Sequence, residues 1–229
     1  MTKTPSHSHR LGELMCTVTE QILWSTSYRE LVCRVGSGQA TYHRFDPRSG
    51  QHQITYGARM IEAKHRPETA SGWLSGREIR QRGYFDGKLS PLNLLAHTCC
   101  HEFAHLLQHS AGQRFRGSVH NRHFYRILDD LHANGRAGAA RAALSDLAAR
   151  HELSLSADGF ALPDPTIDRA SWAVGDSVSF AAGRSERQGD ILKVNRKTCT
   201  VRGTGLSRGM RYRVPMQLLR KSDAVDERG

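Results

Sequence analysis

The sequence lacks the paired cysteines from which zinc ribbons are built. Its cysteines are odd in number and show no CxxC spacing: Cys16, Cys33, Cys99, Cys100 and Cys199. We therefore expect no metal site from them, and the adjacent Cys99 and Cys100 are expected to pack in the core. Scattered thiols without a disulfide pattern are typical of a reducing compartment.

Long apolar runs are also missing. No stretch approaches the roughly 20 apolar residues that a membrane-spanning helix needs. The first twenty residues contain Lys3, Arg10, Glu13 and Glu20 in place of the apolar segment of a secretory signal. These features predict a cytoplasmic protein that does not enter a membrane.

Acidic residues are few. The 229 residues contain 22 Asp or Glu against 33 Lys or Arg, for a net charge of +11. Residues 169–229 hold thirteen basic and six acidic residues, so +7 of the charge lies there and +4 remains for the first 168 residues. A basic segment of this kind favours contact with DNA phosphates without sequence-specific recognition, although charged side chains on a small domain are also commonly just solvated. The candidate nucleic-acid-binding residues are Arg196, Lys197, Arg202, Arg208, Arg211 and Arg213.

His101, Glu102 and His105 form the sequence His-Glu-Phe-Ala-His, an HExxH motif. On an α-helix, residues four apart project from one face, so both imidazoles can bind one metal ion. The adjacent Glu102 can then act as the general base on a metal-bound water, which is the arrangement of zinc hydrolases.

The residues around the motif predict the helix that it needs. Ser90 and Pro91 are typical of an N-cap and first helical residue, and apolar residues follow at spacings of three and four up to Ser110. His97 and His109 extend the two motif histidines into a ladder. All four cannot face one ion, and the outer pairs lack an adjacent carboxylate, so we expect His97 and His109 to be hydrogen-bonded or partly exposed, with support of the ligands as the alternative.

A catalytic zinc ion normally has three protein ligands, so a third donor should lie outside this helix. A polar, glycine-containing stretch follows Ser110, and a new helix is predicted from about Asn121. His120 stands at this junction and is the preferred third ligand. His123 is the reserve and Asp129 a more distant carboxylate, while His120 could instead simply cap the turn.

Two of these motifs resemble the SprT-like zinc metallopeptidases, the family that includes the DNA–protein crosslink protease Spartan. One is the HExxH on an apolar helix, and the other is His120-Asn121-Arg122-His123-Phe124, a histidine followed four residues later by phenylalanine. The resemblance spans about residues 92–131. It implies zinc bound by His101, His105 and His120, with Glu102 as general base. It also implies that an edge strand, assigned to residues 53–60, holds the substrate backbone by strand addition.

The remaining pattern predicts an α+β fold: a domain of helices and a small antiparallel sheet, followed by an all-β module. The resemblance implies that the first domain is a zincin-like catalytic domain. Strand-forming segments 32–45 and 53–61 flank a turn at residues 46–50 and predict a hairpin. Further helices are predicted over residues 11–27, 75–82 and 137–151.

The C-terminal part changes to short alternating strands, which resemble an SH3-like or KOW-type barrel. They are predicted over residues 174–180, 189–194, 199–202 and 212–215. The predicted organisation is a disordered N-terminus (1–10), a metallopeptidase domain (11–153), a proline-containing linker (154–169), the barrel (170–222) and a tail (223–229).

We therefore predict a zinc-dependent metalloendopeptidase of the cytoplasm, associated with the nucleoid if it binds DNA. By the resemblance, its substrates are proteins bound or crosslinked to DNA, which implies a role in DNA–protein crosslink repair. The alternative is a nucleic-acid-binding protein in which the zinc site is structural or catalytically silent. The sequence does not indicate an oligomeric state.

Overall fold

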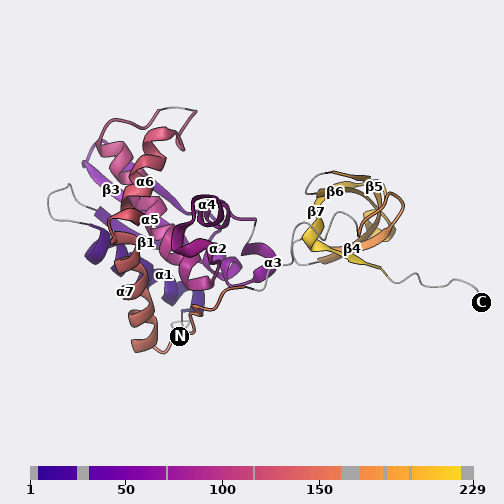
Figure 1. The fold of residues 1–229 in the computed structure, drawn as a ribbon, viewed down its shortest axis with the longest axis horizontal. Helices are drawn as coiled ribbons and strands as arrows, with labels where there is room; N and C mark the ends of the chain where they lie inside the picture. Colours follow the sequence, from indigo (N-terminus) through magenta and orange to yellow (C-terminus); the bar gives the residue numbers. More distant parts are fainter. Residues whose placement is uncertain are drawn as a thin grey trace, which may run out of the picture. The chain divides into compact units, whose positions relative to one another are not determined.

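The chain forms two units, and each contains a sheet of a different kind. The computed structural model describes residues 5–24, 31–70, 72–115, 117–160, 171–182, 185–195 and 198–222. Residues Met1–Phe160 form one compact unit and Ala161–Gly229 a second (Figure 1). The predicted linker lies partly, and the predicted tail wholly, outside the described residues. The fold is α+β, as predicted, and no described helix is long and apolar enough to cross a membrane.

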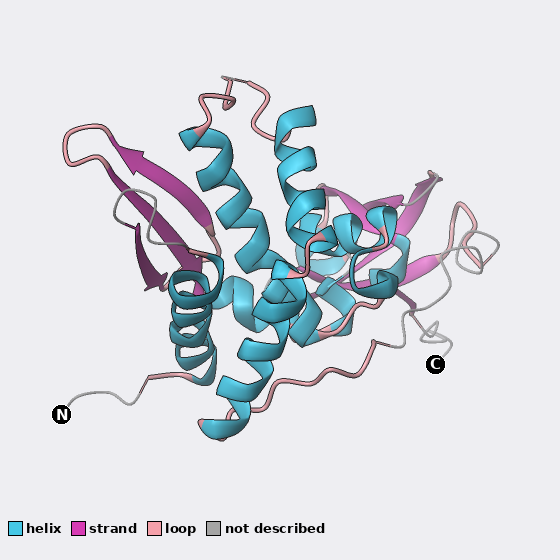
Figure 2. Cartoon of the chain, turned by 60° about the vertical axis from the view of Figure 1, so that its left-hand side comes forward, coloured by secondary structure: helices cyan, strands magenta, loops and turns pink. Residues whose placement is uncertain are grey.

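The first unit combines helices with a three-stranded sheet (Figure 2). Its elements are α1 (His7–Val18), η1 (Thr19–Leu23), β1 (Leu31–Gly36), β2 (Tyr42–Asp46), β3 (Gln51–Gly57), α2 (Ala58–Lys64), α3 (Pro67–Ala70), α4 (Leu74–Arg82), η2 (Tyr84–Gly87), α5 (Pro91–Ser110), α6 (Arg122–Ala133) and α7 (Arg136–Arg150). The helices predicted over residues 75–82 and 137–151 are confirmed as α4 and α7. Helix α1 begins at His7, where the Ser6 side chain accepts a hydrogen bond from the His9 N–H, so residues 7–10 are helical and not part of a disordered end.

The sheet is mixed, and its strand order is β1-β3-β2. The predicted hairpin is confirmed as the antiparallel pair β2–β3, whose turn is held by hydrogen bonds from Arg48 N–H and Ser49 Oγ to the Asp46 carboxylate. The single strand predicted over residues 32–45 is instead two strands, and β1 runs parallel to β3. A purely antiparallel sheet was therefore the wrong prediction.

The prediction that residues 53–60 form a substrate-binding edge is also wrong. Strand β3 lies between β1 and β2, so both of its hydrogen-bonding edges are occupied, and the chain turns into α2 at Ala58. In the described part of the chain, the edge next to α5 is β2, and any strand addition there has to use this edge.

Gly57 ends β3 at a point where another segment of backbone crosses closely. A Cβ atom at this position would lie 2.5 Å from the Gly38 carbonyl oxygen and 2.8 Å from that of Ala40. Only glycine allows such an approach without displacement of backbone. The connection between β1 and β2 is thereby held against the end of β3.

Helix α5 is the centre of the first unit. As predicted, Pro91 is its first residue and the Ser90 side chain caps it by accepting a hydrogen bond from the Asn93 N–H, 3.1 Å away. Its apolar side chains are buried, and Phe103 and Leu106 are 0% exposed. Truncation of a buried phenylalanine such as Phe103 to alanine costs about 3–5 kcal/mol. The helix that carries the motif is thus fixed by its packing.

The second unit is an antiparallel sheet with strand order β7-β6-β5-β4-β8. Its elements are β4 (Ser177–Ala182), β5 (Ser185–Val194), β6 (Thr198–Gly203), η3 (Gly205–Ser207), β7 (Arg211–Pro215), η4 (Met216–Leu218) and β8 (Leu219–Lys221). The four predicted strands are present, around a core that includes Val178, Phe180, Ile191 and Val201. Within the described strands, β7 and β8 are the two ends of the sheet and do not pair, so no closed barrel is found.

Candidate metal centre

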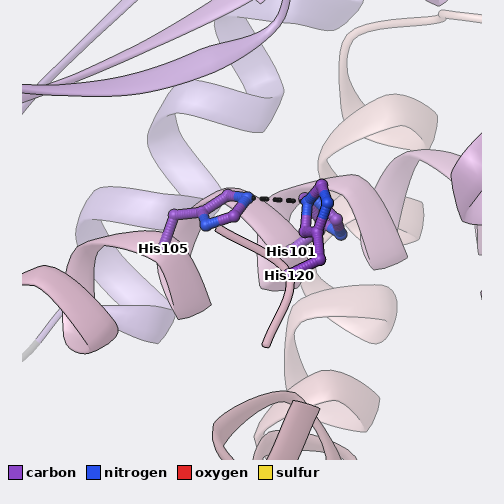
Figure 3. Close-up of side chains that lie close together, drawn as sticks. All are labelled: His101, His105 and His120. Atoms are coloured by element: carbon purple, nitrogen blue, oxygen red, sulfur yellow. Dashed lines mark hydrogen bonds between the residues drawn. The ribbon is translucent and has the colours of Figure 1, made fainter. Parts of the chain in front are cut away.

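Three imidazole rings converge above α5. The Nε2 atom of His120 lies 3.1 Å from that of His105 and 3.2 Å from that of His101 (Figure 3). His101 and His105 lie one turn apart on α5, and His120 belongs to the connection between α5 and α6. The structure therefore brings together the three residues that the sequence suggested as ligands, in an arrangement that could hold a metal ion.

The connection that carries His120 is fastened to both helices. Gln108 on α5 donates hydrogen bonds from Nε2 to the Val119 carbonyl oxygen at 3.0 Å and to Asn121 Oδ1 at 3.1 Å. Asn121 in turn caps α6 by accepting from the backbone N–H groups of His123 and Phe124. These contacts hold His120 over the motif.

Phe124 packs against the same three rings. Its ring centroid lies 4.9 Å from those of His101 and His120 and 4.4 Å from that of His105. The phenylalanine four residues after His120 is therefore part of the floor of the site, and it restricts the orientations that the imidazoles can take.

The other two candidates for the third ligand lie elsewhere. Asp129 forms an ion pair with Arg82 at 2.8 Å and accepts a hydrogen bond from Tyr84 Oη at 2.6 Å. His123 is adjacent to Arg122, whose Nε lies 3.4 Å from His123 Nε2, and neither His123 nor Asp129 belongs to a metal-binding group of described residues.

Glu102 is buried beside this cluster. The residue is 5% exposed, and within the described structure its Oε2 atom has no hydrogen-bond partner. Burial raises the pKa of the Glu102 carboxyl above its usual value. A buried carboxylate with a free oxygen and a raised pKa is suited to accept a proton from a neighbouring molecule.

Glu78 on α4 was not among the residues predicted from sequence. Its Oε2 atom lies 3.0 Å from Nδ1 of His101 and 2.9 Å from Nε2 of His97. A carboxylate only accepts hydrogen bonds, so both histidines donate to it. His101 therefore carries its proton on Nδ1 and directs the lone pair of Nε2 towards His105 and His120.

A second hydrogen bond extends this chain. His97 Nδ1 lies 3.1 Å from His132 Nε2, and the Tyr84 ring stacks on His132 with centroids 3.7 Å apart. Burial raises the pKa of the Glu78 carboxyl, but the hydrogen bonds from His101 and His97 outweigh it and hold that pKa below its usual range. His97 is 0% exposed, and the prediction that it is a hydrogen-bonded histidine is confirmed.

Glu78, His97 and His101 form the second group of described residues whose ligand atoms all lie within 4.8 Å of one another. This group too could hold a metal ion. Its carboxylate–imidazole distances of 2.9 and 3.0 Å are, however, those of ordinary hydrogen bonds. Within the described structure, the Oε1 atom of Glu78 in this group has no hydrogen-bond partner. The first group differs in that its three ligand atoms are all imidazole nitrogens.

A cavity of about 370 Å³ opens beside the three histidines and Glu102. Its rim is formed by residues 39–43 of the β1–β2 connection and β2, and its floor by α5. Lys64, Trp73, Ser75, Thr98 and Arg114 also line it.

One side of the cavity borders a further group of histidines. His43 Nε2 lies 2.8 Å from His52 Nδ1, and Arg114 donates from Nη1 to His43 Nδ1 at 3.0 Å. Burial lowers the pKa of His43 to about 3, so this ring stays neutral and shares the Arg114 hydrogen bond without charge repulsion. The rim of the cavity is thus held by polar contacts from β2 and β3.

The basic residues predicted to bind nucleic acid lie on the second unit. Arg202 and Arg211 are opposite each other on β6 and β7, and Arg213 is two residues further along β7, so all three lie on one face of the sheet. They and Arg208 are exposed, whereas Arg196 and Lys197 lie outside the described residues. Arg202 also lies opposite Asp190 on β5, and its Nη2 is 3.8 Å from the Asp190 carboxylate. The Phe180 ring is buried in the core of this unit, so it is not available to stack on a base.

Comparison with protein-family models, with curated proteins and with solved structures finds no match to this chain.

Proposed function

We propose that the protein is a zinc-dependent metalloendopeptidase of the SprT-like kind, with a zincin-like first unit and an SH3-like second unit. The observation that carries the proposal is the convergence of three imidazole Nε2 atoms beside a buried glutamate with a free carboxylate oxygen. The pattern of two histidines and a glutamate on one helix supports the same chemistry.

The donor set fits zinc. Nitrogen ligands about 2.05 Å from a tetrahedral zinc ion lie about 3.3 Å from one another. The two Nε2–Nε2 distances of 3.1 and 3.2 Å are close to this value without any rearrangement. Burial lowers the pKa of His105 to about 2, so His105 is neutral and its lone pair is available to a cation.

Each residue of the site then has a separate role in peptide-bond hydrolysis. Zinc, when bound by His101, His105 and His120, acidifies water and polarises a carbonyl group. Oε2 of Glu102 takes the proton of the attacking water and returns it to the leaving amine. Glu78 keeps the Nδ1 proton on His101, and Phe124 limits the movement of all three rings.

Strand β2 supplies a place for the substrate backbone. It is the edge of the sheet on the side of α5, and residues 39–43 line the cavity. An extended peptide that pairs with an edge strand is held by main-chain hydrogen bonds that do not depend on its sequence. The peptide bond to be cut would then lie over Glu102.

The second unit supplies recruitment to DNA. Exposed arginines that share one face of β6 and β7 neutralise phosphates without reading bases. Proteins bound or crosslinked to DNA are accordingly the proposed substrates. The alternative, a nucleic-acid-binding protein with a silent zinc site, shares this surface but requires no general base at position 102.

Glu102→Gln distinguishes these two functions. The variant is expected to retain zinc and to lose cleavage of casein, and of a basic protein bound to DNA, by at least about a hundredfold. Glu62→Gln is the matched control, because Glu62 is an exposed residue of α2 that pairs with Arg66. A chelator should abolish the activity of both the wild type and the control.

Cleavage that survives in Glu102→Gln would refute the mechanism. Absence of any cleavage by wild-type protein that contains stoichiometric zinc, with and without DNA, would favour the nucleic-acid-binding alternative.

A further inference from the structure

Lys64, on α2, is a buried cation in the wall of the cavity. The residue is 3% exposed, and its ammonium lies 5.6 Å from the centre of the Trp73 ring. Burial lowers the pKa of Lys64 to about 8, so the amine is still mostly protonated at neutral pH. A buried ammonium is costly unless hydrogen bonds or a counter-ion compensate it.

The compensation within the protein is incomplete. Among the described residues, the Thr98 hydroxyl is the acceptor within hydrogen-bond distance of the Lys64 ammonium, which has three N–H donors. The Thr98 hydroxyl itself donates to the Leu94 carbonyl oxygen at 2.7 Å. Among the described residues, no carboxylate forms a close ion pair with Lys64. Glu102 and Glu78 attract its charge only from a longer distance, and they offset part of the effect of burial on its pKa.

Among the described residues that line the cavity, Ser75 provides a second buried donor. Ser75, at the start of α4, is 7% exposed, and in the described structure its hydroxyl has no hydrogen-bond partner. Lys64, Ser75, Thr98 and Trp73 all line the cavity that contains Glu102. We call these four residues the Lys64 subsite.

The Lys64 subsite lies beside the proposed reaction centre. Thr98 precedes Glu102 by four residues on α5, so the two side chains project from the same face about 6 Å apart along the helix axis. His105 lies on the other side of Glu102 from Thr98 along α5. A peptide held over Glu102 therefore places a neighbouring group of the substrate in the subsite.

We propose that the Lys64 subsite binds a carboxylate of the peptide substrate next to the bond that is cut. Two N–H groups of Lys64 and the Ser75 hydroxyl are donors in need of acceptors, and a carboxylate supplies acceptors together with a negative charge at hydrogen-bond distance. An amide of the same shape supplies a neutral acceptor and a weaker hydrogen bond. The carboxylate comes either from an acidic side chain or from the C-terminus of a peptide.

The cleavage part of this inference rests on the proposed function. It is tested with internally quenched peptides that are identical except for Glu or Gln at one position, scanned along the peptide. At one position the wild type is expected to prefer Glu over Gln in kcat/KM by about tenfold to a hundredfold, the range of a charge-assisted hydrogen bond.

Lys64→Met keeps the length of the side chain and removes the charge, so the Glu-to-Gln ratio should fall to about 1 while the zinc content stays stoichiometric. Lys193→Met, at an exposed position of β5, is the matched control and should keep the wild-type ratio. Equal cleavage of Glu and Gln peptides by the wild type at every position would overturn the inference without any variant. The same preference in Lys64→Met would overturn it too.

Binding separates this inference from the proposed function. Full-length Glu102→Gln protein is titrated calorimetrically with the Glu peptide, the Gln peptide and a short peptide that ends in a free carboxylate or an amide. Tighter binding of a carboxylate, lost in Lys64→Met/Glu102→Gln, supports the subsite even if the wild type cuts nothing. A preference for the Glu peptide over the Gln peptide identifies an acidic side chain as the source of the carboxylate, and a preference for the free carboxylate over the amide identifies the C-terminus. Equal binding of all four peptides would overturn the inference.

Discussion

The two units of this chain treat ionisable side chains in opposite ways. All thirteen histidines lie in the first unit, between His7 and His151, and none lies in residues 171–222. The first unit buries Lys64, Glu78 and Glu102 near its centre. The second has an apolar core, and its arginines at positions 202, 208, 211 and 213 face solvent.

Burial of a charged group destabilises the folded state unless the group is paired, whereas exposure of a charged group has little effect on stability. Side chains are therefore kept buried and ionisable mainly where their reactivity or their hydrogen bonds are used. This contrast is consistent with the proposed function, in which the first unit carries the chemistry and the second contacts DNA. The substitutions and the change of pH described below test this difference between the two units.

The largest effect is expected from removal of a proposed ligand. His105→Ala and His120→Ala should each abolish stoichiometric zinc binding, because two ligands cannot hold the ion as three do. His123→Ala, three residues from His120, should bind zinc as the wild type does. Zinc content is measured by elemental analysis after dialysis. Loss of zinc in His123→Ala alone would show that the wrong histidine has been chosen.

A smaller loss is expected at Glu78. Glu78→Gln retains the shape of the side chain but weakens the hydrogen bond that fixes the proton of His101 on Nδ1. Zinc affinity should fall by about tenfold to a hundredfold, as for other partners of metal-bound histidines. Competition with a chromogenic chelator measures the change, and Glu13→Gln on the exposed side of α1 is the control. An unchanged affinity would mean that Phe124 and packing alone orient His101.

Acid should destabilise the first unit and spare the second. Burial lowers the pKa of His43 to about 3, of His97 to about 4 and of His132 to about 3, from an ordinary value of 6.5. Below pH 6.5 the unfolded chain takes up protons that the folded unit does not, so stability is lost as the pH falls from about 6.5 towards 4.

Hydrogen exchange of the zinc-free protein, followed by mass spectrometry, reports the two units separately. Peptides from α5 and α6 should lose protection across this pH range, whereas peptides from β5 and β6 should not, since no described histidine lies there. Parallel loss in both units would show that their stabilities are coupled.

The smallest effect concerns DNA. Arg211→Gln should lower affinity only a few-fold at physiological salt and reduce the slope of log K against log salt by about 0.9, the value for one phosphate contact. Arg59→Gln, an exposed change in the first unit, is the control. A steeper loss for Arg59→Gln would move the DNA-binding surface onto the first unit.

The motif helix and His120 could be predicted because helical spacing is local. A step of four residues places His101 and His105 on one face wherever the helix lies, and the Ser90-Pro91 start and the Asn121 cap are equally local. The candidate zinc ligands were therefore accessible from the sequence alone.

Glu78 and Lys64 were not predicted because packing, and no motif, brings them to the site. Glu78 comes from α4 and Lys64 from α2, and neither has a characteristic spacing to the histidines. The parallel pairing of β1 with β3 is equally non-local, which is why the edge strand was assigned to residues 53–60. Gly36 and Gly38, within the segment predicted as one strand, did mark its break.

Gly57 affects the shape of the cavity entrance and therefore how the cavity can be engineered. It contributes no side chain and does not line the cavity, yet the absence of its Cβ lets residues 38 and 40 rest against β3 and sets where the rim begins. The shape of the entrance is therefore encoded partly at a position that a screen of cavity-lining residues would omit. A library intended to change what the cavity binds should leave Gly57 fixed and vary the residues around it.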